Sequence, residues 1–410
     1  MSATKCRSCG AVLGRTIFDL GSVPLANEYP SSEHQCDKEE RFPLKICLCE
    51  QCWLLQLEQT IPPSRLFSDY AYFSSYSDTW MSHAKRFAQD SRERWHLDGR
   101  SLVVEVASND GYLLRHFVEL GIPVLGIDPA ENVVPTALAA GIPTEVGFFG
   151  TELAERLAGR GVAADLVVAN NVFAHAPETN DFTAGLARVL APEGILSIEF
   201  PELTTMLTGA QFDQIYHEHV FYFSLLSCER ILCHNGLRVI GAEQLSTHGG
   251  SLRVTACLEA ASHKADGSVS EQQAEERQLG LAGTDVYEAF AAAADRRASS
   301  VRAFLEDAAA RGRSVAGYGA AAKGNTLLNY CGVSTREIRY VVDRSPHKQG
   351  HFLPGTHLPV FSVERLLEDR PDYLVVLAWN LLEEVQTSLP EVREWGGSFV
   401  TTMPALTVLK

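Results

Sequence analysis

The chain has 410 residues, of which 46% are hydrophobic, and a formal net charge of −16 at pH 7. This length exceeds what one core normally supports, so we expect two or three domains. The acidic balance excludes a general nucleic-acid binder, because phosphate contacts need a basic face. No run approaches the roughly 18 apolar residues of a membrane span. The opening MSATKCRSCG lacks the apolar core of a signal peptide, so we expect a cytoplasmic location.

Six of the ten cysteines fall within the first 52 residues, and they include two C-x-x-C pairs. In a reducing compartment such pairs bind metal more often than they form disulfides. Four thiolates complete a closed tetrahedral zinc site with no position open for catalysis. We therefore expect structural zinc; the alternatives are that Cys47 replaces Cys49 or that one pair is redox active. The expected ligands are Cys6, Cys9, Cys49 and Cys52, and Cys36 is expected to be a bystander.

A stretch rich in aromatic and hydroxyl side chains, Asp69 to Ser77, follows the second cysteine pair. One interpretation is packing of the small N-terminal domain against its neighbour. The other is a hydroxyl-rich wall that contacts a polar, sugar-like substrate. The next stretch, Trp80 to Leu97, predicts a helix that carries the chain into a central sheet.

Residues 102–129 have the pattern of a strand, a polar turn, a helix and a second strand. The second strand ends in Asp128, where nucleotide-binding sheets place an acid that accepts the ribose hydroxyls. The glycine fingerprint of dinucleotide-binding folds is absent. Instead, Glu105 followed by Asn109-Asp110-Gly resembles motif I of S-adenosylmethionine (SAM) methyltransferases, with Ala107 as a mild departure. The alternative is a Rossmann-like domain that does not bind SAM, in which the acid at the end of the strand has no cofactor role.

Later strands of the same domain supply further candidate cofactor residues. Residues 165–171 predict a strand that ends in two amides, and residues 195–200 predict the next strand. An aromatic side chain, Phe149, is placed to stack near an adenine. Each of these residues can instead simply end a strand. The expected cofactor-binding residues are Glu105, Ala107, Asn109, Asp110, Asp128, Phe149, Asn170 and Asn171.

The segment 212–224 brings a base, a carboxylate and a phenol within four positions: Tyr216, Glu218 and His219. Histidine titrates near neutral pH and is the usual general base, and a phenol can hold a developing enolate oxygen. The alternatives are an H-x-H metal pair or core histidines satisfied by the carboxylate. A second candidate imidazole, His248, precedes two glycines that allow close backbone approach, and Arg253 can pair with an anion.

The C-terminal part has a glycine-rich turn of its own. Residues 314–318 predict a strand that runs into Gly319 and a helix, and Tyr340 to Asp343 predict a second strand ending in an acid. The turn is not a P-loop, because Lys323 precedes its glycine. We expect a diphosphate cradle of backbone amides at the helix start, with charge from Lys323. The alternative is an unused Rossmann turn.

Together these motifs resemble the sugar C-methyltransferases that act on nucleotide-linked 4-keto-deoxysugars in antibiotic biosynthesis. The resemblance covers nearly the whole chain, from the paired cysteines through G-S-V-P-L-A-N, Y-F-S-S-Y-S, S-N-D-G, Y-H-E-H and T-H-G-G-S-L-R to G-Y-G-A-x-x-K-G-N-T. It implies an α/β protein with a small zinc-binding N-terminal domain (1–70), a central Rossmann-like SAM methyltransferase domain (71–235) and a C-terminal Rossmann-like domain that helps to hold the nucleotide sugar (236–410). It also implies that Tyr76 lines the substrate site.

The implied reaction is SAM-dependent C-methylation of a deoxythymidine-diphosphate (dTDP)-linked 4-keto-deoxysugar. In the family, the residue matching His219 is the base that forms an enolate, and Tyr216, helped by Glu218 or His248, is expected to stabilise the oxyanion. We expect SAM and structural zinc as cofactors, a small-molecule substrate, and no nucleic-acid or membrane partner. The expected substrate-binding residues are Tyr76, Tyr222, Arg253, Lys323 and Asn325.

Three rival functions remain open on the sequence alone. A nicotinamide-dependent oxidoreductase or epimerase would use the C-terminal glycine turn. An O-methyltransferase would share the SAM site but methylate oxygen. A zinc-ribbon binding module would use the sheets only to scaffold a partner contact.

Overall fold

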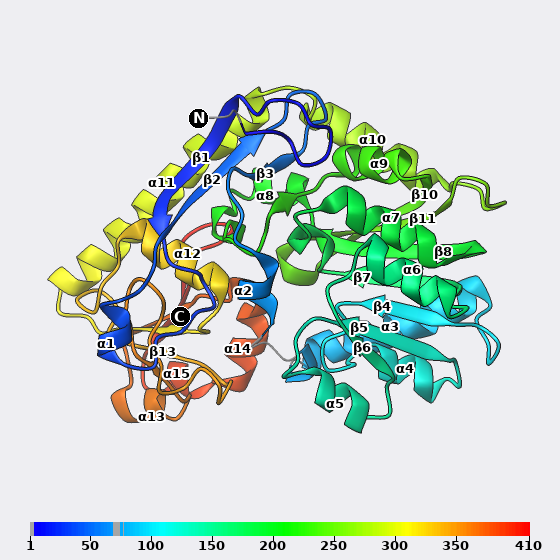
Figure 1. The fold of residues 1–410 in the computed structure, drawn as a ribbon. Helices are drawn as coiled ribbons and strands as arrows, with labels where there is room; N and C mark the ends of the chain where they lie inside the picture. The colour runs from blue at the N-terminus through cyan, green and yellow to red at the C-terminus, as the bar shows by residue number, and fades with distance from the viewer. Residues whose placement is uncertain (1–3, 69–73, 77) are drawn as a thin grey trace.

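The fold is that of a computed structural model, which describes residues 4–68, 74–76 and 78–410, with only the backbone of Tyr76, Asp78 and Thr79. Within these residues the strands form three sheets (Figure 1). The N-terminal sheet lies at the top of the view, the central sheet on one side below it, and the C-terminal sheet on the other. The α/β fold class expected from the sequence is confirmed.

The N-terminal sheet is antiparallel, with the order β1-β2-β3-β9. Its last strand comes from the middle of the chain, because Leu55 of β3 pairs with Tyr222 of β9. β1 continues to Val23, so the first residues of the G-S-V-P-L-A-N motif belong to a strand. Its strands are β1 (Arg15–Val23), β2 (Phe42–Leu48), β3 (Leu55–Leu57) and β9 (Phe221–Tyr222).

The central sheet has the order β10-β11-β8-β7-β4-β5-β6. β6, β5, β4, β7 and β8 are parallel, and the hairpin β10–β11 continues the sheet antiparallel to β8. The boundary expected at 235/236 therefore separates this hairpin from its own sheet. The strands are β4 (Val103–Val106), β5 (Val124–Asp128), β6 (Thr144–Val146), β7 (Ala164–Asn170), β8 (Leu190–Pro201), β10 (Leu237–Leu245) and β11 (Ser251–Leu258).

The C-terminal sheet has the order β14-β13-β12-β15-β16-β17. Its strands are parallel except β17, which is antiparallel to β16. The strands are β12 (Val315–Tyr318), β13 (Val341–Val342), β14 (Val360–Phe361), β15 (Tyr373–Val376), β16 (Ser398–Thr401) and β17 (Thr407–Leu409).

Helices cover the sheets and connect the domains. The longest, α11, runs from beside the N-terminal sheet to the C-terminal domain (Figure 1). Gly280 adopts a left-handed conformation that ends α10 and separates it from α11. The α-helices are α1 (Glu33–Cys36), α2 (Pro63–Phe67), α3 (Asp78–Trp95), α4 (Leu114–Glu119), α5 (Val134–Ala139), α6 (Thr151–Gly159), α7 (Thr179–Val189), α8 (Leu203–Thr208), α9 (Leu225–His234), α10 (Gly267–Leu279), α11 (Asp285–Ala310), α12 (Ala322–Cys331), α13 (Arg365–Asp369), α14 (Leu382–Ser388) and α15 (Glu391–Glu394). The 3₁₀ turns are η1 (Ser74–Tyr76), η2 (Phe173–His175), η3 (Phe212–Gln214), η4 (Thr247–Gly249) and η5 (Trp379–Leu381).

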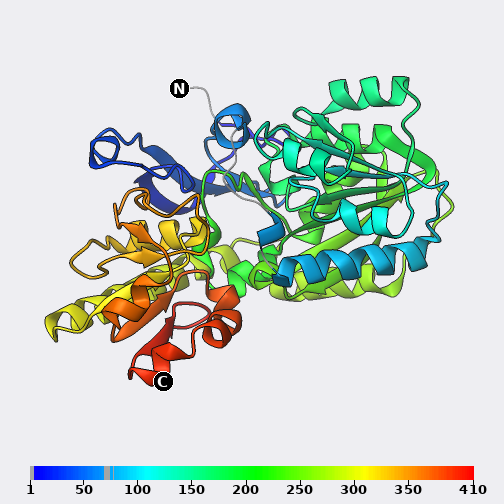
Figure 2. The same cartoon turned by 90° about the horizontal axis from the view of Figure 1, so that it is seen from below.

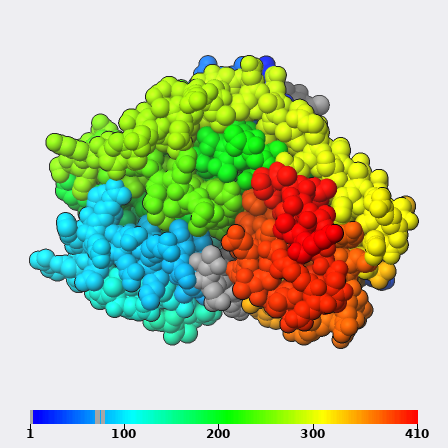
Figure 3. Space-filling model, turned by 180° about the vertical axis from the view of Figure 1, so that it is seen from behind, coloured from blue at the N-terminus to red at the C-terminus, as the bar shows by residue number. Residues whose placement is uncertain are grey.

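The central sheet and the C-terminal sheet each contain a point where the order of their parallel strands reverses. The chain leaves β4 for β5 on one side and returns to β7 on the other, and it leaves β12 for β13 and returns to β15. Ligands of open α/β sheets bind outside the carboxyl ends of the strands at such points. Figure 2 shows these two α/β units side by side, and Figure 3 shows from behind that they are in contact.

The apolar cores continue across the domain boundaries. One buried cluster joins the N-terminal sheet, α11 and the C-terminal sheet. Another joins the N-terminal cysteines to one face of the central sheet. Among the described helices, none has the length and apolar character needed to cross a membrane.

The turn between β10 and β11 packs tightly against the C-terminal domain, and this generates a prediction for Gly249→Ala. Gly249 has φ +91, and a Cβ there would lie 2.1 Å from Trp379. Gly280, with φ +81, has open space around it and is the matched control. Both variants lose about 1–2 kcal/mol from left-handed strain, and Gly249→Ala loses about 1–3 kcal/mol more from overpacking. Thermal unfolding should show the larger drop for Gly249→Ala; equal drops would contradict this packing.

Candidate active site

A cleft of about 1800 Å³ lies between the carboxyl ends of the central and C-terminal sheets. Its lining comes from all three parts of the chain, including Asn27, the β4–α4 turn, the segment 214–219 and the turn after β12. Pockets for a single small molecule usually measure about 300–1,000 Å³. The cleft therefore has room for two ligands side by side.

The central-domain wall has the geometry of a nucleoside site. Both oxygens of Asp128 accept backbone hydrogen bonds, from Asn109 N at 2.8 Å and from Ala130 N at 2.9 Å. A carboxylate oxygen has a further lone pair, so Asp128 can still accept ribose hydroxyls. Ala107 and Asn109 both hold left-handed conformations, with φ 60 and 51, and line the cleft.

Asn170 and Asn171 end strand β7 at the same wall and also line the cleft. Asn170 Oδ1 and Asn171 Nδ2 are buried and have no hydrogen-bond partner within the described residues. Phe149 lies nearby in the lining and packs edge-on against Phe182. Unsatisfied buried polar atoms are costly unless a ligand or water pairs with them. These side chains therefore fit SAM, with Asp128 for its ribose and the two amides for its polar groups.

Two of the expected cofactor residues lie behind this wall, so their prediction as direct ligands is not supported by the geometry. Glu105 is 1% exposed, and burial raises its pKa well above the usual value. Asp110 is fully buried, and its Oδ2 accepts a hydrogen bond from Ser75 N at 3.2 Å. Asn109 Oδ1 accepts one from Ser74 N at 3.0 Å. The S-N-D-G turn thus holds the turn η1 by hydrogen bonds.

The segment 214–219 positions an imidazole in the cleft with a defined tautomer. His219 Nδ1 lies 2.9 Å from the Gln214 carbonyl oxygen, and because a carbonyl only accepts, Nδ1 carries the proton. Nε2 is then the basic nitrogen, and the Tyr216 hydroxyl donates to it at 2.6 Å. Burial, with the neighbouring His175, lowers the His219 pKa well below its usual value. The ring is therefore neutral at pH 7 and able to accept a proton.

Two residues that had no role assigned from the sequence, Asn27 and His175, contact the segment that carries His219. Asn27 Nδ2 donates to Glu218 Oε1 at 2.7 Å, so the G-S-V-P-L-A-N motif reaches the cleft. His175 Nδ1 donates to the Glu218 carbonyl oxygen at 2.8 Å, and its ring lies edge-on to that of His219, with centroids 5.0 Å apart. Two features of the sequence could have indicated these residues. One is the G-S-V-P-L-A-N motif, which contains Asn27, and the other is the position of His175 shortly after Asn170 and Asn171.

A chain of amide side chains links the imidazole segment to the β10–β11 turn. Gln211 Nε2 donates to the Gly249 carbonyl oxygen at 3.1 Å, and Gln214 Nε2 donates to Gln211 Oε1. The carbonyl at the end fixes the direction of both bonds, since it can only accept. The backbone of Gln214 that holds His219 is therefore tied to the turn that carries His248.

His248 and Lys323 line the opposite side of the cleft. His248 has φ 54, and its ring lies 4.8 Å from that of Trp80. Lys323 Nζ donates to the His248 carbonyl oxygen at 2.7 Å and lies 4.9 Å from the centre of the Trp379 ring. The turn after β10 is thereby joined to the start of α12.

The turn after β12 repeats the arrangement found at Asp128. Asp343 follows β13, and its two oxygens accept hydrogen bonds from Ala320 N at 2.7 Å and Ser345 N at 2.8 Å. Arg344 and Lys348 extend the lining on this side. The expected glycine turn and strand-end acid are thus present, and they face the central domain across the cleft.

Three of the expected substrate residues have other roles, and one cannot be placed. Arg253 pairs with buried Glu199 at 2.9 Å, because the two are opposite in the β8–β11 register. Tyr222 is 4% exposed in the N-terminal core. Asn325 Nδ2 donates to the Ala26 carbonyl oxygen at 2.6 Å and so anchors the neighbouring loop. Within the described residues, none of these three lines the cleft. The side chain of Tyr76, like most of the segment 69–77, lies outside the described part of the chain.

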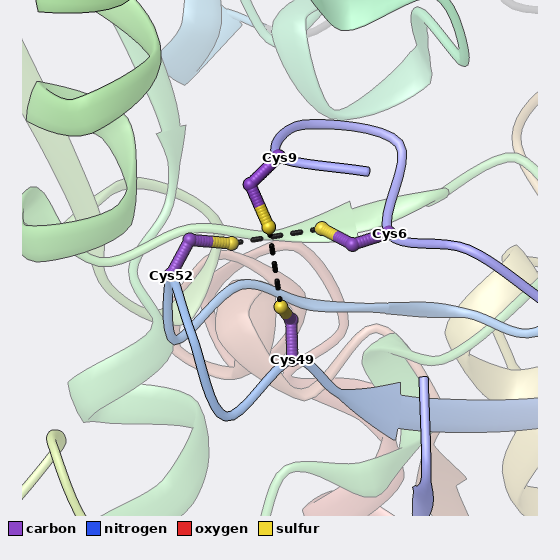
Figure 4. A group of neighbouring side chains, drawn as sticks. All are labelled: Cys6, Cys9, Cys49 and Cys52. Atoms are coloured by element: carbon purple, nitrogen blue, oxygen red, sulfur yellow. Dashed lines mark hydrogen bonds between the residues drawn. The ribbon is translucent and has the colours of Figure 1, made fainter. Parts of the chain in front are cut away.

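The four expected cysteine ligands converge on one point (Figure 4). Their sulfur atoms all lie within 4.8 Å of one another, with Cys6–Cys52 at 3.6 Å and Cys9–Cys49 at 3.5 Å. Zinc–sulfur bonds of about 2.3 Å in a tetrahedron require sulfur separations near 3.8 Å. Gln56 Nε2 donates to Cys6 Sγ at 3.1 Å. The thiolate set therefore fits zinc, with no open position.

The remaining N-terminal cysteines are outside this set. Cys47 Sγ contacts Thr16 Oγ1 at 3.7 Å instead. β2 ends at Leu48, so Cys47 belongs to the strand, whereas Cys49 begins the turn that leads to Cys52 and faces the other ligands. Cys36 lies at the end of α1 and is likewise outside it.

Comparisons with known sequences agree with this geometry. Three sequence-family profiles match: "Putative zinc binding domain" at residues 6–67, "Methyltransferase domain" at 104–196 and "C-methyltransferase C-terminal domain" at 246–404. C-methyltransferase NovU from Streptomyces niveus is 37% identical over 400 residues, covering 98% of this chain and 95% of NovU. A ubiquinone biosynthesis O-methyltransferase from Bartonella bacilliformis is 22% identical over 149 residues, covering 34% of this chain and 60% of that protein.

Among solved structures, magnesium protoporphyrin IX methyltransferase from Synechocystis PCC 6803 is 19% identical, with a TM-score of 0.34 over 43% of this chain and 82% of that one. The fold and site define a SAM-dependent methyltransferase with a structural zinc domain. The near full-length similarity to NovU identifies the group: the chain belongs to the C-methyltransferase family that includes NovU. C-methylation is thereby favoured over the rival oxidoreductase, O-methyltransferase and binding-module functions.

The cysteine geometry predicts different effects for Cys49→Ser and Cys47→Ser. Loss of Cys49 leaves three thiolates, so bound zinc should fall well below one per chain and the melting temperature should drop. Cys47→Ser should retain one zinc per chain. Elemental analysis of the purified proteins measures both. Zinc loss in the Cys47 variant alone would contradict the ligand set.

Two partly buried imidazoles, those of His175 and His248, predict a pH-dependent stability. Burial lowers the pKa of both His175 and His248 to about 4, against an unfolded value near 6.5. Their contribution is complete above pH 6.5 and is lost as the pH falls from 6.5 to about 4, because the unfolded chain then binds more protons. The unfolding free energy should decrease by about 1 kcal/mol per pH unit for each ring.

Urea unfolding at pH 7, 6 and 5 measures this slope. In His248→Asn the new side chain tolerates the left-handed conformation. The variant lacks one of the two titrating rings, so the slope of its unfolding free energy against pH should be smaller by about 1 kcal/mol per pH unit. An unchanged slope in this variant would show that His248 is protonated in the folded state.

Proposed function

We propose that the protein transfers the methyl group of SAM to a ring carbon of a dTDP-linked 4-keto-deoxysugar through an enolate, with His219 as the base. Such a reaction belongs to the assembly of antibiotic sugars, as the motif resemblance implies. The observation that carries the proposal is the His219 ring, which has its proton fixed on Nδ1 and its basic Nε2 in a cleft between the two sheets.

Carbon becomes nucleophilic only after it loses a proton, which explains the need for a base in the cleft. A ketone acidifies the adjacent C–H bond, and a neutral imidazole can take that proton at pH 7. Bound SAM supplies the methyl group as an electrophilic sulfonium. The main task of the remaining residues is to hold two ligands in line and to exclude water.

The two walls of the cleft support a two-ligand arrangement. Asp128, Asn170 and Asn171 are available to SAM, whereas the turn after β12 is available to a nucleotide diphosphate. The first-turn amides of α12 lack intrahelical partners, as in any helix, and can bind an anion. The base lies on the segment between these walls, where a sugar ring attached to the nucleotide would meet the methyl donor.

Removing the base predicts separate effects on chemistry and binding. His219→Asn should abolish methylation of a dTDP-4-keto-6-deoxysugar and the exchange of its adjacent proton with deuterated solvent. SAM affinity should stay within about threefold, because His219 is not among the side chains that fit SAM. Mass spectrometry measures transfer and exchange, and calorimetry measures SAM binding.

His217→Asn is the matched control from the same motif. The His217 ring faces the Pro43 carbonyl oxygen at 3.3 Å instead of the cleft, so folded His217→Asn protein should retain turnover. Normal exchange in His219→Asn would remove His219 as the base, and an O-linked methyl in the product would overturn the proposal for carbon.

A further inference from the structure

An enolate oxygen needs a hydrogen-bond donor, and the phenol next to His219 is already engaged. Tyr216 has one hydroxyl proton, and it lies on the 2.6 Å bond to His219 Nε2, since Nδ1 carries the ring proton. Nε2 has one lone pair, so this hydrogen bond must open before Nε2 can take a proton from carbon. Until it opens, Tyr216 is not available to the substrate, and a second donor in the cleft can stabilise the developing oxyanion from the start.

Lys323 is a cation in the cleft wall whose hydrogen-bond and ring partners are neutral. The nearby carboxylate of Asp213, which accepts a hydrogen bond from Trp379 Nε1 at 2.6 Å, acts on it only through its charge and partly offsets the lowering of the Lys323 pKa by burial. Its ammonium donates to the His248 carbonyl oxygen and lies over the Trp379 ring. Among the described residues, no carboxylate oxygen lies within 4.0 Å of it, whereas Lys348 has Asp343 at 3.8 Å. A partly buried cation without an ion pair is costly unless an anion forms or binds beside it.

The position of this cation relates it to the base. Lys323 and His248 both line the cleft together with His219. The charge of Lys323 contributes to lowering the pKa of His219 and of His248, so it acts on the same small region. The Gln211–Gln214 chain also ties this region to the His219 segment through the Gly249 carbonyl.

We propose that Lys323 is a catalytic residue that donates a hydrogen bond to the substrate's keto oxygen as that oxygen becomes an enolate. This assignment rests on the proposed function of the cleft. His219 Nε2 takes the proton of the adjacent carbon, the C–H electron pair forms the carbon–carbon double bond, and the carbonyl electron pair moves to oxygen. The ammonium of Lys323 keeps its proton and stabilises that oxygen. With SAM bound, the enolate carbon would attack the methyl group, the methyl–sulfur bond would break with its electron pair on sulfur, and S-adenosylhomocysteine would leave as the carbonyl reforms. The imidazolium later releases its proton to solvent.

This role differs from the diphosphate contact that the glycine turn suggests for Lys323. A diphosphate contact would affect binding of the nucleotide, whereas an oxyanion contact would affect proton removal at saturating substrate. Lys348 is a matched control, because it also lines the cleft, donates to a backbone carbonyl (Ala320 O, 2.6 Å) and lies over an aromatic ring, that of Tyr29. The two lysines differ in that Lys348 has a carboxylate neighbour, Asp343, at 3.8 Å.

The test is solvent deuterium exchange of dTDP-4-keto-6-deoxyglucose with full-length zinc-loaded protein and S-adenosylhomocysteine, at saturating sugar nucleotide. Lys323→Gln should slow exchange by about 100-fold or more, the usual effect of losing an oxyanion donor, with dTDP affinity by calorimetry within about threefold. Lys348→Gln should exchange within about threefold of wild type. Lys323→Arg should restore most of the rate.

A pH profile gives a second readout that a purely structural role would not move. Burial lowers the pKa of Lys323 to about 8, so enzyme-dependent exchange by the wild type should decline above pH 8. In Lys323→Arg, which stays protonated, the decline should be absent up to pH 10.

Four outcomes would overturn the assignment or the function on which it rests. Weaker dTDP binding by Lys323→Gln with normal exchange at saturation would show a diphosphate contact instead. Equal losses in the Lys323→Gln and Lys348→Gln variants would show a general charge effect. Wild-type protein that neither binds nor exchanges the keto-sugar would remove the proposed function itself, whereas wild-type exchange with an unaffected Lys323→Gln would remove only Lys323.

Discussion

The hydrogen bond from His219 Nδ1 to the Gln214 carbonyl is the constraint on which the proposed chemistry depends. It fixes which nitrogen is basic, and burial keeps that nitrogen unprotonated at neutral pH. The carbonyl is held in turn, because the Gln214 side chain is bonded through Gln211 to the β10–β11 turn. A base that must meet a carbon acid needs such support, because small displacements of reacting atoms are costly in rate.

The two larger sheets place ligands by the same local device. In each, an acid after the second strand accepts hydrogen bonds from a backbone amide of the first βα turn and from the amide two residues further on: Asp128 in the central domain and Asp343 in the C-terminal domain. Each acid thereby stabilises a turn that exposes backbone to the cleft. The two turns face each other across the cleft, and this arrangement is the basis for the proposal that the cleft holds a nucleoside donor and a nucleotide-linked acceptor.

Local patterns in the sequence predicted the strands, the turns and the zinc ligands well. The β4-turn-α4-β5 unit and the break at Gly280 follow from apolar spacing and glycine, which act over a few residues. The pairing of β9 with β3 and of β11 with β8 joins distant segments, and no local pattern specifies it. For this reason Arg253, expected to meet an anionic ligand, pairs with Glu199 across the sheet.

Side-chain direction was the other limit of sequence interpretation. Glu105 and Asp110 belong to the S-N-D-G motif region, yet they lie behind the cleft wall and hold the turn instead of lining it. Tyr222 and Asn325 lie in motifs that reach the site, but they pack into the core or anchor a neighbouring loop. A motif marks a region of the fold, and only the three-dimensional arrangement separates the residues that contact a ligand from those that support them.

The strand shared between the N-terminal sheet and the segment 212–224 has a consequence for how this enzyme could be divided. β9 follows His219 by two residues and pairs with β3, which in turn follows the second cysteine pair directly. Asn27 adds a contact from the same domain to Glu218. The zinc domain therefore supports the segment that carries the proposed base, and a methyltransferase core excised without it would keep its SAM wall but lose the framework that orients the His219 imidazole.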